Sequence, residues 1–365
     1  MKNMMRFELK KSVSIRKNWF VFIALVFVFL LYFGSLNNVN QKQWALEERS
    51  LNEQIRLLND SIRHEKSEVS TDAMSFQMEE LKLFQKILSA HLSGDWKDKA
   101  AAEIEMLDLR INQSPEMVAD EVRRVAEERV DFLTILLTDS IKPVYERTSV
   151  DGAHLLWNIS LLFLPVLFYL LFFILVGDIY GYEQEGGTIR LLRSTPYSQL
   201  MIQSSKWIAS LVLSMLYILI TITIPFIIGS LTNGVGNFSY PIKVGGEWST
   251  IGATLNLVWL LVLATLIFSI CLIQFIAYFM KSGTFTIFLG MTLFLVFRFI
   301  PENLIPTNVL QWIPFYYFKV NILVDVGNDF FRQGMFCLSL ASVALLVIPY
   351  VIPYIRNKTF WYRIT

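Results

Sequence analysis

The sequence is poor in charged residues, histidine and cysteine. Only 17% of its 365 residues are charged, three are histidine and two are cysteine. Cys271 and Cys337 both lie in apolar stretches, which argues against a disulfide framework and favours buried packing thiols. The net charge is only +1, so no overall basic field points to a nucleic-acid partner.

Several chemical motifs are also missing. No segment matches G-x-x-x-x-G-K-[ST], so we do not expect the chain to bind ATP by itself. There is no H-E-x-x-H motif and no paired-cysteine motif, and His64, His91 and His154 each stand alone. The sequence therefore predicts no catalytic residue, no metal site and no cofactor site in this chain.

Long apolar stretches are abundant: hydrophobic residues make up 54% of the chain. A helix needs about 20 apolar residues to cross a bilayer core. The first stretch is preceded by basic residues, as in a signal peptide, but its length and the lack of a small-x-small site favour a retained span. We expect an all-α polytopic membrane protein with six transmembrane helices, near Trp19–Leu36, Leu155–Gly177, Trp207–Ser230, Thr254–Phe279, Gly283–Phe297 and Gly334–Tyr354.

The lysines and arginines of the short connecting segments are distributed unevenly. One side of the membrane receives 13 of them and the other side four, which predicts a multi-pass cell-membrane protein with both termini in the cytoplasm. The predicted parts are an N-terminal amphipathic helix at 1–18, a first span at 19–37, an extracytoplasmic helical domain at 38–152, spans two to six within 153–355 and a cytoplasmic tail at 356–365. Within 153–355 lie a cytoplasmic loop at 178–206 and an outer aromatic segment at 301–333.

The segment at 38–152 differs from the rest of the chain because it carries 15 Lys or Arg against 23 Asp or Glu. We expect two long and two shorter helices, the long ones continuing spans one and two outward. Helix starts are expected at Asp95-Trp96 and at Ser114-Pro115-Glu116, where a capping side chain precedes the first turn. Two apolar stripes with alternating four- and three-residue spacing support the helices: Leu51, Ile55, Leu58 and Ile62, and Val118, Val122, Val125, Phe132 and Leu136.

The first 18 residues alternate apolar and basic positions. Met5, Leu9 and Val13 are spaced as one helix face, set against Lys2, Arg6, Lys10 and Lys17. This pattern suits a helix in the cytoplasmic headgroup layer, and it suits equally an ordinary basic flank that obeys the orientation rule.

The predicted spans lack Asp, Glu and Lys in their central parts. Ion-coupled carriers need an ionisable group at mid-membrane, so their mechanism fits this chain poorly. Arg298 lies near the outer end of span five and, with Trp312 and Phe315 of the outer aromatic segment, is a candidate substrate contact. The alternative, which we favour for Arg298, is that it snorkels to the outer surface beside Pro301.

Chemically varied residues gather in the loop between spans two and three. Gly186-Gly187 breaks the chain, Thr188 can cap a short helix, and Arg190 and Arg193 flank its apolar positions. Thr195-Pro196 then starts another helix that runs through Lys206. Such a short amphipathic helix suits either docking to a protein or the lipid surface.

This loop resembles the signature loop of ABC-2 type transporter permeases. The likeness rests on an acid followed by Gly-Gly-Thr-Ile-Arg, on Pro196 and on Lys206 at the head of the next span. The resemblance implies two ABC ATPase subunits that bind ATP and Mg, and a second permease copy or homologue, within membrane lipid. It also implies that the loop fits a groove of the ATPase through Glu183, Glu185, Gly187, Thr188, Arg190, Arg193 and Pro196.

The function expected from this resemblance is that of the permease subunit of an ATP-driven exporter. Its substrate would be amphipathic or hydrophobic, such as an antimicrobial peptide, a drug in multidrug export, or a lipid. The alternative is a membrane sensor or scaffold whose helical outer domain binds a ligand or partner, although the short tails offer no signalling module. An intramembrane enzyme would need a set of His, Asp or Glu within the spans, which the sequence lacks.

Overall fold

A computed structural model of the chain describes residues 2–64, 71–112, 120–145, 148–162, 164–185, 198–280, 282–299 and 305–361. The chain divides into two compact units. Unit 1 comprises residues 1–33, 151–236 and 242–365, and unit 2 comprises residues 34–150 and 237–241. Each unit is treated below by itself.

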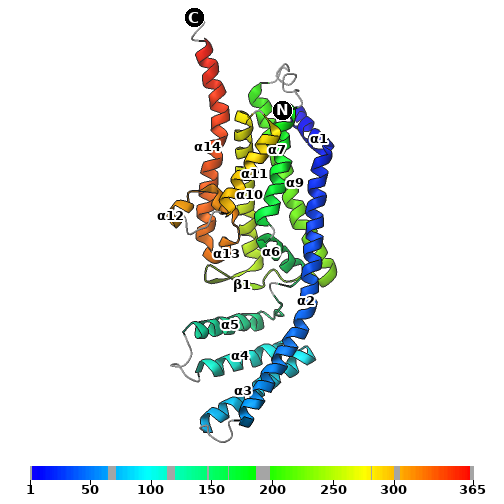
Figure 1. Cartoon of the computed structure of the whole chain (residues 1–365), viewed down its shortest axis with the longest axis vertical. Helices are drawn as coiled ribbons and strands as arrows, with labels where there is room; N and C mark the ends of the chain where they lie inside the picture. Colours follow the sequence, from blue (N-terminus) through cyan, green and yellow to red (C-terminus); the bar gives the residue numbers. More distant parts are fainter. Residues whose placement is uncertain are drawn as a thin grey trace. The chain divides into compact units, whose positions relative to one another are not determined.

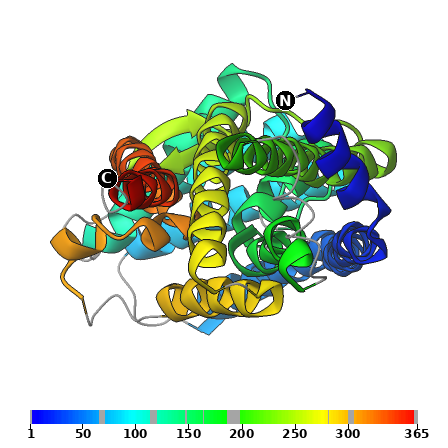
Figure 2. The same cartoon turned by 90° about the horizontal axis from the view of Figure 1, so that it is seen from above.

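Unit 1 is a bundle of helices arranged around α10 (Figures 1 and 2). Seen from above, α10 lies between α14 on one side and α7 and α9 on the other, and it also contacts α11 and α6 (Figure 2). The helices of this unit are α1 (Lys2–Ser14), the first part of α2 (Arg16–His64), α6 (Gly152–Leu162), the π-helix η2 (Leu164–Phe168), α7 (Tyr169–Glu185), α9 (Gln199–Asn233), α10 (Ile251–Met280), α11 (Gly283–Phe299), α12 (Thr307–Leu310), the 3₁₀ helix η4 (Pro314–Phe318), α13 (Ile322–Val326) and α14 (Asn328–Trp361).

The apolar helices make the chain a polytopic membrane protein. Four helices are long and apolar enough to cross a membrane, in α2, α9, α10 and α14. A fifth is possible if Gly152–Leu161 and Val166–Gly181, which are inclined by 75°, form one broken span around Pro165. The helix Gly283–Phe299 is apolar but shorter, so the described residues support four to five spans, and the number six remains a prediction.

One hairpin departs from the all-helical expectation. Strands β1 (Pro241–Val244) and β2 (Glu247–Thr250) pair directly before α10. Their two-residue turn is Gly245-Gly246, and both glycines have positive φ (61° and 88°), as tight hairpin turns require. No strand was predicted here, because the segment lies in a connection between two predicted spans.

Helices α7 and α11 pack through glycines. A Cβ atom on Gly181 would lie 2.0 Å from the Cα atom of Gly283, and one on Gly177 would lie 2.2 Å from the side chain of Ile287. At the other end of the contact, Gly290 faces the ring of Phe173. Small residues at such positions let two helix backbones approach closely, which is how membrane helices gain packing energy without a hydrophobic driving force.

Unit 2 is helical, and α4 (Trp96–Asn112) lies between α3 (Thr71–Ser93) and α5 (Asp120–Thr138) (Figure 1). The continuation of span one into this unit is confirmed, because α2 is one helix from Arg16 to His64. A core of Leu51, Phe84, Ile87, Ala102 and Met106 joins α2, α3 and α4, with Ile55 and Leu58 packed against it. The first predicted apolar stripe is therefore a buried face.

The predicted helix start at Asp95-Trp96 is confirmed, since the Asp95 Oδ1 atom accepts hydrogen bonds from the backbone N–H groups of Lys97 and Asp98. The start at Ser114-Pro115-Glu116 lies outside the described residues. The second stripe is only partly right: Phe132 and Leu136 are buried, whereas Val122 and Val125 are exposed. Val118 also lies outside the described residues.

The expected outward continuation of span two is wrong, because α5 ends at Thr138 and α6 begins only at Gly152. Ser140 has φ 53° and stops α5. The N–H of Ile141 bonds to the Leu136 carbonyl at 2.8 Å and that of Ser140 to the Leu137 carbonyl at 3.2 Å, which is the Schellman pattern. Ile141 and Leu136 are both buried, so an apolar contact supports the turn.

We expect Gly181→Leu to destabilise the protein by about 3 kcal/mol or more, because the side chain would have to displace the α11 backbone. Gly34→Leu is the matched control, since no heavy atom lies within 4 Å of its Cβ position. The measurement is the thermal unfolding midpoint of the purified full chain. Equal midpoints for the two variants would contradict the close helix contact.

We also expect acid to weaken unit 2 through Glu47. Burial of this carboxyl opposes ionisation, but hydrogen bonds from Lys99 and Tyr145 and the adjacent positive charge outweigh it and lower its pKa below 4.5. Its contribution to stability is thus complete above pH 4.5 and is lost as the pH falls through the folded-state pKa.

The test of this pH dependence is Glu47→Gln, compared with Glu53→Gln on the exposed face of the same helix. At pH 7, Glu47→Gln should reduce hydrogen-exchange protection in α3 and α4 by roughly five- to thirtyfold, equivalent to about 1–2 kcal/mol. The difference from wild type should narrow below pH 4.5. A pH-independent difference would show that ionisation of Glu47 is not involved.

Candidate functional site

The loop between α7 and α9 is the segment that is predicted to contact the ATPase subunits. Its residues Gly187, Thr188, Arg190, Arg193 and Pro196 lie outside the described residues. Glu183 and Glu185 belong to the last turn of α7, but only their backbone is described. What the structure does describe is the base of the loop, where α7 ends and α9 begins.

Three neighbouring positions of α7 tie the loop base to three other helices. Asp178 accepts a hydrogen bond from the Lys17 Nζ atom of α2 at 2.9 Å. The Ile179 carbonyl accepts one from the Lys206 Nζ atom of α9 at 3.4 Å. Gly181 contacts Gly283 of α11, as described above. The end of α7 is therefore held by α2, α9 and α11 within about one helical turn.

Lys206 is buried although it carries a charge. A buried ammonium is costly unless polar groups surround it, and its position beside the α7 backbone supplies one such group. The adjoining start of α9 is capped: the Ser198 Oγ atom accepts a hydrogen bond from the N–H of Met201 at 3.2 Å. The loop thus connects the ends of two well-formed helices, α7 and α9.

The N-terminal helix α1 belongs to the same region, because it packs against α9 and α7. Its buried face carries Met4, Glu8 and Ser12, with Glu8 fully buried and 3.4 Å from the Lys11 Nζ atom. Of the predicted apolar face, Met5 and Leu9 are half-buried, and the Val13 side chain lies outside the described part. The face that α1 buries within unit 1 is the neighbouring, largely polar one, and the placement of the apolar face in the headgroup layer stays a prediction.

The end of α1 is joined to α2 by a short, hydrogen-bonded turn. The Asn18 side-chain amide donates to the Ser12 carbonyl at 2.7 Å, and the N–H of Asn18 donates to the Ile15 carbonyl at 3.1 Å. Asn18 is buried. A movement of the loop base would consequently be passed to α1 as well as to α2.

The predicted substrate contacts lie in different surroundings. Phe315 is buried and stacks on Phe297 with ring centroids 4.9 Å apart, and it also contacts Phe268 and Phe318. Trp312 is 67% exposed, and Arg298 is half-buried in the last turn of α11. Phe315 has a clear packing role in η4, and a substrate contact by any of the three remains a prediction.

Sequence reasoning missed the loop-base residues Lys17, Asp178 and Gly283. Two signals were available: Asp178 is an acid directly after a long apolar run, and Gly181 and Gly283 are glycines near the ends of two spans. Neither feature predicts which residue lies opposite it, because the contacts join segments that are more than a hundred residues apart in the sequence. The tertiary structure brings them together.

Comparison with known proteins completes the assignment. No curated protein and no solved structure matches the chain. The sequence does match the family described as "ABC-2 family transporter protein" over residues 3–356, which is nearly its whole length. Permeases of this family lack an ATPase of their own and act with ABC ATPase subunits that hydrolyse ATP. The chain therefore belongs to the ABC-2 transporter family and is a multi-pass membrane permease subunit.

Proposed function

We propose that this permease exports an amphipathic or hydrophobic substrate, such as a peptide, a drug or a lipid, and that the α7–α9 loop transmits the work of the ATPases. The observation that carries the proposal is the loop base: Asp178, Ile179 and Gly181 connect the end of α7 to α2, α9 and α11. A force applied to the loop would reach several membrane helices at once.

The coupling follows from differential binding. If the loop contacts the ATPases differently in their separated and ATP-closed states, closure shifts the equilibrium between permease conformations. In the proposed assembly, two ATPase subunits engage two permease chains, one loop each. Loop residues Glu183, Glu185, Thr188, Arg190 and Arg193 would make the charged contacts.

The surfaces of the membrane helices fit a lipid-embedded assembly of permeases. In α10 most of the apolar stretch is buried within the chain, whereas less than a third is buried in α2, α9 and α14. Phe20, Ile23 and Phe27 of α2 are exposed at helical spacing. Such faces need lipid or a second permease copy as a partner.

The proposed topology and energy source rest on the charge distribution and on the missing relay. With both termini in the cytoplasm, unit 2 faces outward, and the spans carry no central acid that could couple a proton gradient. The driving force then comes from the cytoplasmic ATPases. An apolar or amphipathic substrate suits a pathway without charged groups.

The topology can be tested by cysteine labelling in intact cells. In a background with the buried Cys271 and Cys337 replaced by alanine, we expect an impermeant maleimide to label Ser89→Cys in unit 2 but not Ser198→Cys. Both serines are exposed in the structure, so burial does not explain a difference. Disruption of the cells should make Ser198→Cys reactive, and the opposite labelling would reverse the orientation.

The docking role of the loop can be tested by charge reversal. We expect Glu185→Lys and Arg190→Glu to weaken ATPase association by roughly one and a half to three and a half orders of magnitude, because breaking a desolvated charge pair costs about 2–5 kcal/mol. The measurement is co-purification of the Walker-motif ATPase with the tagged permease from native membranes.

Matched controls for these reversals are Glu53→Lys and Arg49→Glu, which lie on the exposed face of α2 in unit 2. They should retain the ATPase. If the loop only lay on the lipid surface, Glu185→Lys would strengthen its binding to the membrane, since added positive charge favours anionic headgroups. Full ATPase recovery with both loop variants would remove the loop as the docking element.

A further inference from the structure

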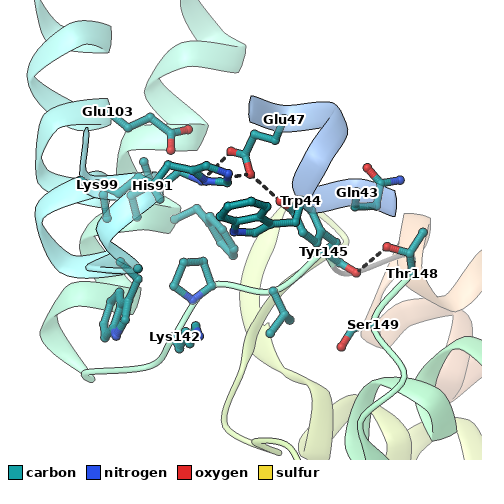
Figure 3. Close-up of a pocket in the computed structure, with 18 of the residues that line it drawn as sticks. Gln43, Trp44, Glu47, His91, Lys99, Glu103, Lys142, Tyr145, Thr148 and Ser149 are labelled. Atoms are coloured by element: carbon teal, nitrogen blue, oxygen red, sulfur yellow. Dashed lines mark hydrogen bonds and ion pairs between the residues drawn. The ribbon is translucent and has the colours of Figure 1, made fainter. Parts of the chain in front are cut away.

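Unit 2 contains a pocket of about 730 Å³, within the usual range of small-molecule sites (Figure 3). It is lined by residues of α2, α3, α4 and α5 and of the segment 142–149 that follows the Ser140 turn. Trp44, Trp96 and Phe132 contribute aromatic surface. Nothing in the proposed transport mechanism uses this pocket.

A buried polar cluster forms one wall of the pocket. Glu47 accepts a hydrogen bond from the Tyr145 hydroxyl and another from the Lys99 Nζ atom (Figure 3). The His91 ring stacks on Trp44 with centroids 4.5 Å apart and an interplanar angle of 22°. Since Glu47 is already bonded to two donors, it offers little to a further ligand.

His91 retains an unused donor. Its Nδ1 atom lies 3.4 Å from the Lys99 Nζ atom, which can only donate, and 3.7 Å from the Glu47 Oε2 atom, which is beyond hydrogen-bonding distance. We therefore assign the ring proton to Nε2. His91 is only 4% exposed, and its Nε2 atom has no hydrogen-bond partner among the described residues. A buried N–H without an acceptor is unfavourable, so an acceptor group arriving there would be stabilised.

Among the described residues that line the pocket, two carboxylates are paired and one lysine has no ion-pair partner. Glu47 pairs with Lys99, and Glu103 pairs with the Arg129 guanidinium at 2.9 Å. Lys142 is exposed at the pocket and forms no ion pair with the described part of the chain. Both carboxylates are therefore neutralised, and the remaining hydrogen-bonding capacity of Lys142 and His91 is that of donors.

The aromatic surface is accessible from the pocket. Trp44 is 47% exposed although its ring stacks on His91, so part of the indole remains open to a ligand. An apolar or aromatic ring placed there would bury area on both partners and gain stacking energy. The described part of the pocket thus combines an aromatic wall with a lysine that has no ion-pair partner there.

We propose that this pocket binds small organic anions that carry one acidic group on an aromatic or apolar body. The acidic group would meet Lys142 and the His91 N–H, and the body would cover Trp44. An organic cation of the same shape would find both carboxylates already paired and would be repelled by Lys142. The proposal concerns binding to unit 2 and does not depend on the identity of the transported substrate.

The test uses the full chain in nanodiscs of zwitterionic lipid and two probes with the same ring and opposite charge, 2-naphthoate and 2-naphthylmethylammonium. Equilibrium dialysis should show saturable binding of 2-naphthoate at one site per chain. The ammonium probe should bind about tenfold more weakly or less, since the attraction to Lys142 becomes a repulsion. Equal binding of the two probes would overturn the proposal.

Two pairs of variants locate the site. Lys142→Glu should weaken 2-naphthoate binding about tenfold or more, whereas Lys82→Glu, an exposed lysine on α3 outside the pocket, should leave it unchanged. Trp44→Ala should abolish saturable binding, and Trp248→Ala in the hairpin should not. Equal effects within either pair would place the anion elsewhere, and unfolding midpoints confirm that each variant is folded.

Discussion

The approach of Gly181 to Gly283 is the contact on which the loop base depends. Because neither residue has a Cβ atom, the α7 and α11 backbones meet directly, and this closeness fixes where α7 ends. Asp178 and Ile179 then fall where Lys17 and Lys206 can reach them. A larger side chain at either glycine would separate the helices and displace both polar contacts.

These contacts support the proposed coupling through the α7–α9 loop. A helix end that is held by one neighbour would bend locally under a force, whereas one held by three neighbours would transmit the displacement to them. The π-helix η2 interrupts the chain just before α7, around Pro165. The bend between α6 and α7 falls at this break, as expected because π-helical turns and proline are common causes of helix kinks.

Unit 2 is stabilised differently, since its helices belong to an acid-rich segment of the sequence. Its stability comes from an ordinary apolar core around Phe84 and Met106 and from the polar cluster around Glu47. The Schellman turn at Ser140 directs the following segment back over α2, α3 and α4, where Tyr145 reaches Glu47. The pocket exists because this segment covers the helices without filling the space between them.

Local sequence patterns were enough to predict the class of the molecule. Apolar length predicted membrane helices, the motif at Glu185–Pro196 predicted the transporter family, and the stripe from Leu51 to Ile62 predicted a buried helix face. These features are local, so they can be deduced from spacing and composition alone. The cap at Asp95 was predictable for the same reason.

Contacts between residues far apart in the sequence could not be predicted in this way. Lys17 pairs with Asp178 across 161 positions, and Glu47 meets Tyr145 across 98. The burial of Glu8 in α1 could not be predicted, because it depends on neighbours that the local pattern does not contain. Span two does not continue outward, because a serine at positive φ ends α5, a conformation that the sequence permits but does not reveal. Close contacts, buried charges and pockets depend on the packing of whole helices, and no local pattern records that packing.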